Sequence, residues 1–236
     1  MWRKNEFRFR VFDPTYLLVM IPALLLSIGA QALVSSAFGR WTRVRNSAGL
    51  TGVEVAERLI RSAGLGGVGL EGIPGVRSDH FDPSKNVVRV SQDVATVPSV
   101  AAMAVVAHEL GHAQQYQERS ILIALRGFLV PAMQFSPMVS YLLIVVGFLL
   151  NSLGLIQIGI LFYGIVVVFM LLTLPVEIDA SRRGLKMLNN AGLMLSADDS
   201  SGSRSVLTAA ALTYVAAAVG ALLNLLYYIS LMNRRR

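Results

Sequence analysis

The chain has 236 residues, of which 54% are hydrophobic and 15% are charged, and its formal net charge is +7. This apolar fraction exceeds the ~45–50% of soluble domains, and the positive charge flanks apolar runs without a nucleic-acid-binding motif, so we expect lipid headgroups and no nucleic acid as its partner. The absence of cysteine excludes disulfides, thiolate metal sites and cysteine nucleophiles.

Four apolar runs predict membrane-spanning helices. The first follows a basic segment, residues 1–15, and is about as long as the ~20 residues that cross a bilayer. The uncharged run 127–176 is about twice that length, and the turn-forming residues 151–154 divide it. Buried helices of a soluble core are the alternative, but such a core rarely needs so long a run without charge. The expected spans are residues 16–34, 127–150, 155–176 and 206–232.

A polar segment, residues 35–126, separates the first two spans. Thr51 and Glu54 have the spacing of a capping box and predict the start of a helix. Further on, Val88, Arg89 and Val90 alternate between apolar and polar and predict a strand. As an edge strand it could hold an extended peptide by backbone hydrogen bonds; alternatively, it pairs inside a small sheet.

The next predicted helix carries the sequence HELGH. His108 and His112 are four residues apart, so both imidazoles project from one face and can share a zinc ion at ~2.0–2.1 Å. Glu109 lies about 100° around the helix, where it can take a proton from an activated water and pass it to a leaving amine. The alternative is a pair of ordinary histidines beside a surface glutamate. Gln114 and Gln115 are interpreted as plain polar positions of this helix.

A catalytic zinc site needs three protein ligands and an open position. The run 127–176 contains no acid and no histidine, so Glu177, which opens the polar segment 177–205, is the first candidate after the motif. Two spans lie between His112 and Glu177 and return the chain to the same side of the membrane, whereas one or three would separate the ligands. We therefore predict that His108, His112 and Glu177 meet at the membrane boundary.

Five segments of the chain resemble a known family: TGVEVAERLI, SDHFDPSKNVVRVS, AVVAHELGHAQQ, PVEIDASRRGLKML and AALTYVAAA. HELGH with a downstream Glu-x-x-Ala is similar to the gluzincin-type membrane peptidases, which include the heat-shock membrane proteases and the prenyl-protein peptidases. The resemblance is closer to the bacterial neutral zinc metallopeptidases of the YugP-like group. It implies a membrane-bound zinc endopeptidase in the bacterial cell membrane, and the analogy with heat-shock membrane proteases implies a cytoplasmic active site.

The expected fold is therefore a mostly α integral membrane protein. About four transmembrane helices accompany a small α+β, zincin-like catalytic part, residues 35–126, with a short strand before the metal-binding helix. The position of Glu177 at the end of the third span makes a membrane-proximal polypeptide the expected substrate. Nothing in the sequence specifies an oligomeric state.

Five further side chains are candidates for roles around the metal. Asp179 could orient a ligand, but it lies about 200° around the helix from the expected ligand glutamate, so an ion pair with Arg183 is preferred. Ser181 stands where the broader group often has an aspartate that supports a ligand histidine, and it could hydrogen-bond one. Arg182 or Arg183 could stabilise an oxyanion, with a solvated cation as the preferred alternative. His80 could also stabilise an oxyanion, or it could simply fasten its own turn. We prefer the second role.

Two other functions fit parts of the sequence. A catalytically silent membrane adaptor would keep zinc for structure and show no turnover. Metal transport across the four spans is disfavoured, because the span interiors carry no histidine or carboxylate to pass an ion along. Asn224, Gln134 and Gln157 are strongly polar there and are more simply helix-packing contacts.

Overall fold

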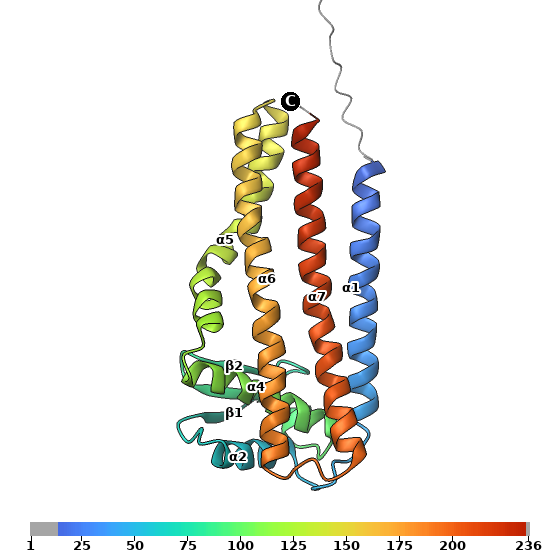
Figure 1. Ribbon diagram of the computed structural model, residues 1–236, viewed down its shortest axis with the longest axis vertical. Helices are drawn as coiled ribbons and strands as arrows, with labels where there is room; N and C mark the ends of the chain where they lie inside the picture. Colours follow the sequence, from blue (N-terminus) through green and yellow to red (C-terminus); the bar gives the residue numbers. More distant parts are fainter. Residues whose placement is uncertain (1–13, 235–236) are drawn as a thin grey trace, which may run out of the picture.

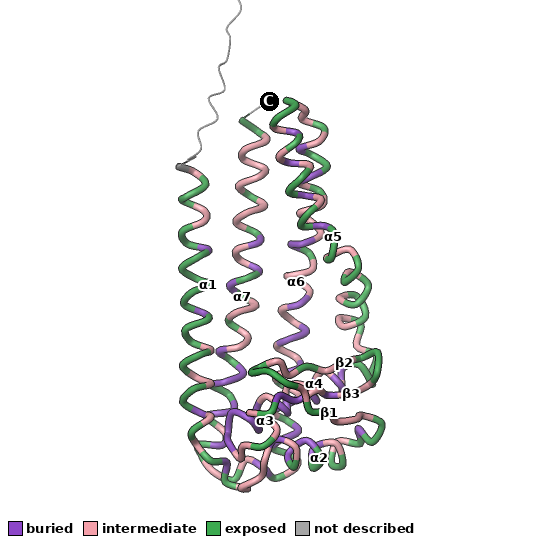
Figure 2. The backbone as a smooth tube through the Cα atoms, turned by 180° about the vertical axis from the view of Figure 1, so that it is seen from behind, coloured by how far each residue is buried: buried purple, intermediate pink, exposed green. Residues whose placement is uncertain are grey.

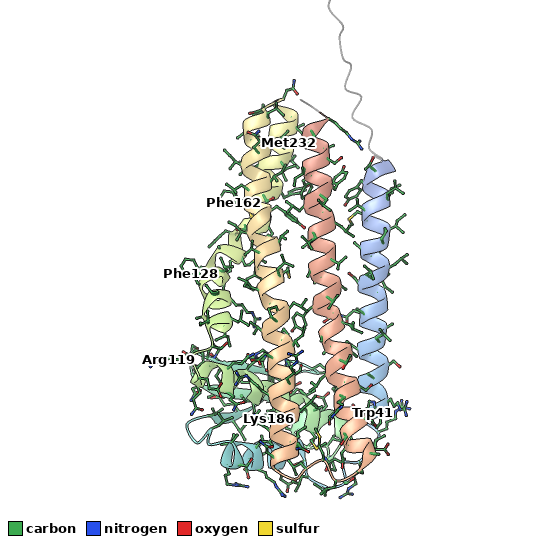
Figure 3. The ribbon with its side chains drawn as sticks, in the orientation of Figure 1. Trp41, Arg119, Phe128, Phe162, Lys186 and Met232 are labelled. Atoms are coloured by element: carbon green, nitrogen blue, oxygen red, sulfur yellow. The ribbon has the colours of Figure 1, made fainter. Side chains whose placement is uncertain are left out.

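Four long helices run side by side in the computed structural model, which describes residues 14–234 (Figure 1). Within that range, four helices are long and apolar enough to cross a membrane, with mean hydropathy between 1.8 and 2.7 over their most apolar windows. Large apolar side chains such as Phe128 project outward from them (Figure 3). The fold is thus mostly α with four candidate membrane spans, as predicted. These helices are α1 (Pro14–Trp41), α5 (Ile121–Leu149), α6 (Leu153–Asn190) and α7 (Ala197–Asn233).

The long helices extend beyond the apolar runs that predicted them. The expected span 155–176 and the first part of segment 177–205 form one helix, α6, and α7 begins well before residue 206. Apolar runs mark the part of a helix that suits lipid, whereas its ends depend on caps and turns. Asn151 has a φ of 55° in the turn between α5 and α6, where a turn was expected, and Ser196 forms a capping box at the start of α7. Residues 1–13 of the basic segment lie outside the described range.

A small α+β part lies at one end of the long helices. It contains α2 (Gly52–Ser62), a three-stranded sheet, α3 (Gln92–Ala95) and α4 (Val100–Gln117). Figure 2 shows most of the buried backbone gathered at this end, whereas the long helices are mainly intermediate or exposed. Trp41 and Lys186 lie at the same end in Figure 3. The capping box predicted at Thr51 and Glu54 is present at the start of α2. The hydrophobic core therefore surrounds α4, the helix with the HELGH sequence.

The sheet has the order β1-β3-β2, from β1 (Gly69–Ile73), β2 (His80–Asp82) and β3 (Val87–Ser91). β3 pairs in parallel with β1 and antiparallel with β2. Of the two alternatives for Val88, Arg89 and Val90, pairing inside a small sheet is therefore confirmed, and the edge strand is wrong. Both neighbours give weak strand signals, because β1 contains two glycines and β2 has only three residues. The free edge beside α4 belongs to β2.

Two glycines bring α4 and α6 into backbone contact. A Cβ added to Gly111 on α4 would collide with the carbonyl oxygen of Ala180. A Cβ added to Gly184 on α6 would lie 2.7 Å from the carbonyl oxygen of Ala107. Any other residue would force the helices apart, so the glycines set the distance between the side chains that α4 and α6 present to each other.

Candidate metal centre

Three side chains meet where α4 packs against α6. The Oε2 atom of Glu177 lies 3.2 Å from Nε2 of His108 and 3.4 Å from Nε2 of His112. Glu177 is only 3% exposed. Two ligand atoms bound to one zinc ion at ~2.0–2.1 Å in tetrahedral geometry are about 3.3 Å apart, so the spacing suits that metal. Two imidazoles and one carboxylate are also a donor set of catalytic zinc sites. The residues present therefore fit a zinc ion.

Glu109 lies beside this cluster, on the side of the sheet. Its Oε2 accepts a hydrogen bond of 3.0 Å from the backbone N–H of Phe81 in β2. Its charge also acts on His112. The carboxylate is thus held between the two histidines and the free edge of the sheet.

The second oxygen of Glu177 faces residues that the sequence analysis missed. Arg126, near the start of α5, has its Nη1 3.4 Å from Oε1 of Glu177. The phenol of Tyr214, on α7, interacts electrostatically with the same carboxylate. Arg126 and Glu177 are the last charge before the uncharged run 127–176 and the first charge after it. Two consecutive antiparallel spans place the residue before the first span and the residue after the second at the same end of the pair. The positions of Arg126 and Glu177 in the sequence could therefore have predicted their ion pair.

The outer nitrogens of both histidines also have partners. Nδ1 of His108 lies 3.1 Å from Oγ of Ser181, so the hydrogen bond that Ser181 could form with a histidine is present. Nδ1 of His112 lies 3.1 Å from Oε1 of Gln115. Gln115 is 1% exposed and donates through Nε2 to Oδ2 of Asp179 at 2.7 Å. Its position three residues after His112, on the same helix face, could have predicted this contact.

Comparison with known proteins identifies the family. Residues 16–233 match the family described as "Putative neutral zinc metallopeptidase". The chain belongs to that family of neutral zinc metallopeptidases. The Bacillus subtilis (strain 168) protein named "Putative membrane protease YugP" is 40% identical to it over 221 residues, which cover 94% of this chain and 98% of that protein. No solved structure matches. The resemblance found in the sequence is thereby confirmed.

In this family member, the charged residues that follow Glu177 in α6 form a separate cluster. Asp179 accepts a hydrogen bond of 2.7 Å from Arg183, which is the intrahelical ion pair that was preferred, and it also binds Gln115. Arg183 donates in addition to Glu118 at 2.6 Å. Arg182 is exposed. Arg183 therefore already binds two carboxylates, whereas Arg126 lies 3.4 Å from the carboxylate of Glu177.

His80 is tied to its own turn. Its Nδ1 lies 2.8 Å from the carbonyl oxygen of Ser78, and its Nε2 lies 3.4 Å from Arg89. These contacts agree with the turn-fastening role that was preferred for it.

Zinc affinity is expected to fall as the pH is lowered below neutrality. Burial tends to lower the pKa of His112, but its hydrogen bond to Glu177 and the charge of Glu109 outweigh burial and raise this pKa above that of ordinary histidine. A metal can bind only the unprotonated imidazole, so protons compete with zinc below the raised pKa, by about tenfold per pH unit for each histidine that titrates.

A competition titration of zinc between pH 5.5 and 8 measures this effect. His80→Gln is the matched control and should show the same pH dependence, because the ring of His80, the first residue of β2, contacts Ser78 and Arg89 and none of the three candidate ligands. An affinity that did not change over this range would contradict the prediction.

Proposed function

We propose that this family member is a membrane-bound zinc-dependent endopeptidase whose metal ligands are His108, His112 and Glu177. The observation that carries the proposal is the meeting of Nε2 of both histidines with Oε2 of Glu177 at 3.2 and 3.4 Å. The family description and the membrane protease relative support peptide-bond hydrolysis. The proposed location is the bacterial cell membrane, with the active site on the cytoplasmic side.

Glu109 is the proposed general base. A bound zinc ion supplies a Lewis acid that lowers the pKa of water toward ~7 and polarises the scissile carbonyl. The Glu109 carboxylate then accepts the proton of the attacking water and transfers it to the amine that leaves. The N–H of Phe81 orients this carboxylate, because it binds one of its two oxygens and leaves the other free.

The free edge of β2 is the proposed site for the substrate backbone. An extended peptide that pairs with this edge passes directly beside Glu109, since the N–H of Phe81 on that edge already contacts the carboxylate. β3 has no free edge for this role. Because α5 and α6 enter their apolar stretches next to the metal ligands, the proposed substrate is a membrane-proximal polypeptide.

Zinc analysis and a peptidase assay on the purified full chain test this function. We expect about one zinc ion per chain, cleavage of a membrane-anchored polypeptide, loss of cleavage with a chelator, and recovery when zinc is added back. Glu177→Ala should remove zinc and cleavage together. Cleavage that persists after the metal has been removed would contradict the proposal.

Arg126→Met is expected to lower zinc affinity by about tenfold, within the range for residues that orient a metal ligand. The guanidinium holds Oε1 of Glu177, so that Oε2 faces the histidines, and without it the carboxylate can rotate. Arg204→Met, at an exposed cation on α7, is the matched control and should keep the affinity of the wild type. Equal affinities for the two variants would mean that Arg126 does not orient Glu177.

A further inference from the structure

Gln115 is a buried side chain with a complete set of polar contacts. It lies on α4, one turn after His112, and is 1% exposed. Its Nε2 donates to the carbonyl oxygen of Val176 at 2.9 Å and to Oδ2 of Asp179 at 2.7 Å. Its Oε1 lies 3.1 Å from Nδ1 of His112. These hydrogen bonds of its side chain are therefore with α6 or with a proposed metal ligand.

The orientation of this amide follows from the chemistry of its partners. A backbone carbonyl and an ionised carboxylate can only accept hydrogen bonds, so both hydrogens of the Gln115 amide must face Val176 and Asp179. The flipped amide would place its oxygen against two acceptors. Arg183 donates to the same Asp179 oxygen at 2.7 Å and keeps that carboxylate in place. The Gln115 oxygen, an acceptor only, is therefore the atom that faces His112.

We propose that Gln115 is a positioning residue that holds the proton of neutral His112 on Nδ1 and so leaves the lone pair of Nε2 for the metal. This inference rests on the proposed zinc site. An acceptor opposite Nδ1 can bind only a ring that carries its proton there. His108 lacks this constraint, because the hydroxyl of Ser181 can either donate or accept.

The constraint matters because a competing acceptor faces the other nitrogen. Oε2 of Glu177 lies 3.4 Å from Nε2 of His112 and would accept a hydrogen bond if the proton moved there. In that tautomer Nε2 has no lone pair for a metal. Gln115 opposes this tautomer by stabilising the proton on Nδ1. Without Gln115, the Glu177 carboxylate would favour the tautomer protonated on Nε2, which cannot bind the metal through that atom.

Gln115→Met tests this role, because methionine fills a similar volume and has no amide. The chain contains three histidines, so selective 15N labelling of histidine in the metal-free protein gives three rings to assign. We expect the His112 proton on Nδ1 in the wild type and on Nε2 in the variant, at a pH where the ring is neutral. Zinc affinity should fall by about 10- to 100-fold. Gln114→Met, at the neighbouring position of α4, is the matched control and should change neither measurement.

A second variant separates this role from simple packing. Gln115→Glu keeps an oxygen acceptor opposite Nδ1 of His112, and its carboxyl, when it binds a proton, donates to Asp179 in place of the amide, so the His112 proton should stay on Nδ1. Unchanged signals of His80 and His108 would report an intact fold in each variant. The inference is overturned if the proton stays on Nδ1 in Gln115→Met, if it leaves Nδ1 in Gln115→Glu, or if zinc affinity in Gln115→Met stays within about threefold of the wild type. A wild type that bound no zinc would overturn the proposed function, and the tautomer measurement would still decide the role of Gln115.

Discussion

Glu109→Gln is expected to lower kcat by at least about 10²–10⁴-fold while the chain still binds zinc. The amide of glutamine cannot accept the proton of the attacking water at neutral pH, so the general-base step is lost. In the wild type, the N–H of Phe81 donates to the Glu109 carboxylate at 3.0 Å. The glutamine side chain keeps an oxygen that can accept this hydrogen bond, so the fold around position 109 should be preserved. Rates of polypeptide cleavage and zinc content, measured on the same preparation, check both parts.

A glutamate outside the site provides the control. Glu57→Gln removes a carboxylate from the exposed pair with Arg61 on α2, and it should leave both kcat and zinc content unchanged. Full activity in Glu109→Gln would rule out the proposed mechanism. A wild type that binds zinc but cleaves nothing would instead favour a silent zinc-binding adaptor.

Gly111→Ala is expected to have the second largest effect, on stability and on zinc binding together. The added methyl group would collide with the carbonyl oxygen of Ala180, and neither backbone can yield without moving a helix. Overpacking of this kind costs about 1–3 kcal/mol, more than the ~0.5–1 kcal/mol that alanine gains over glycine inside a helix. A shift of α4 against α6 also separates the histidines from Glu177. We therefore expect a lower Tm and at least about tenfold weaker zinc binding.

Gly164→Ala is the matched control for this substitution. Gly164 lies within α6, and a Cβ built there meets no atom within 4 Å. The Tm of Gly164→Ala should equal or slightly exceed that of the wild type, because the only expected change is the higher helix propensity of alanine. Equal Tm values and zinc affinities for Gly111→Ala and Gly164→Ala would show that the contact between α4 and α6 does not hold the ligands together.

The number of spans and the cluster of His108, His112 and Glu177 could be predicted because both follow from the number and order of the apolar runs in the sequence. Apolar runs give the number of spans, and two spans between His112 and Glu177 place these residues on the same side. The structure brings these two residues together with His108. Spacing within a helix also predicted the ion pair of Asp179 with Arg183.

The sheet and the orienting contacts could not be predicted in the same way. β2 has only three residues, too few for a pattern of alternation to appear, so the edge strand was assigned to β3. The spacing of Gln115 from His112 and the place of Arg126 beside the uncharged run could have suggested their contacts with His112 and Glu177. The contacts of Gln115 with Val176 and Asp179 depend instead on how α4 packs against α6, which no local pattern in the sequence encodes. Tyr214 lies inside an apolar span, where a tyrosine is an ordinary residue.

The division of the site between α4 and α6 imposes an order on its assembly. A nascent chain that ends before α6 contains both histidines and Glu109 but lacks Glu177. On the proposed function, such a chain has two of three ligands and no orienting contact from Asp179. Hydrolytic capacity therefore arises only after α5 and α6 have been inserted as a hairpin. On the proposed function, biosynthesis itself thus keeps the chain inactive until the third of its four candidate spans has been made.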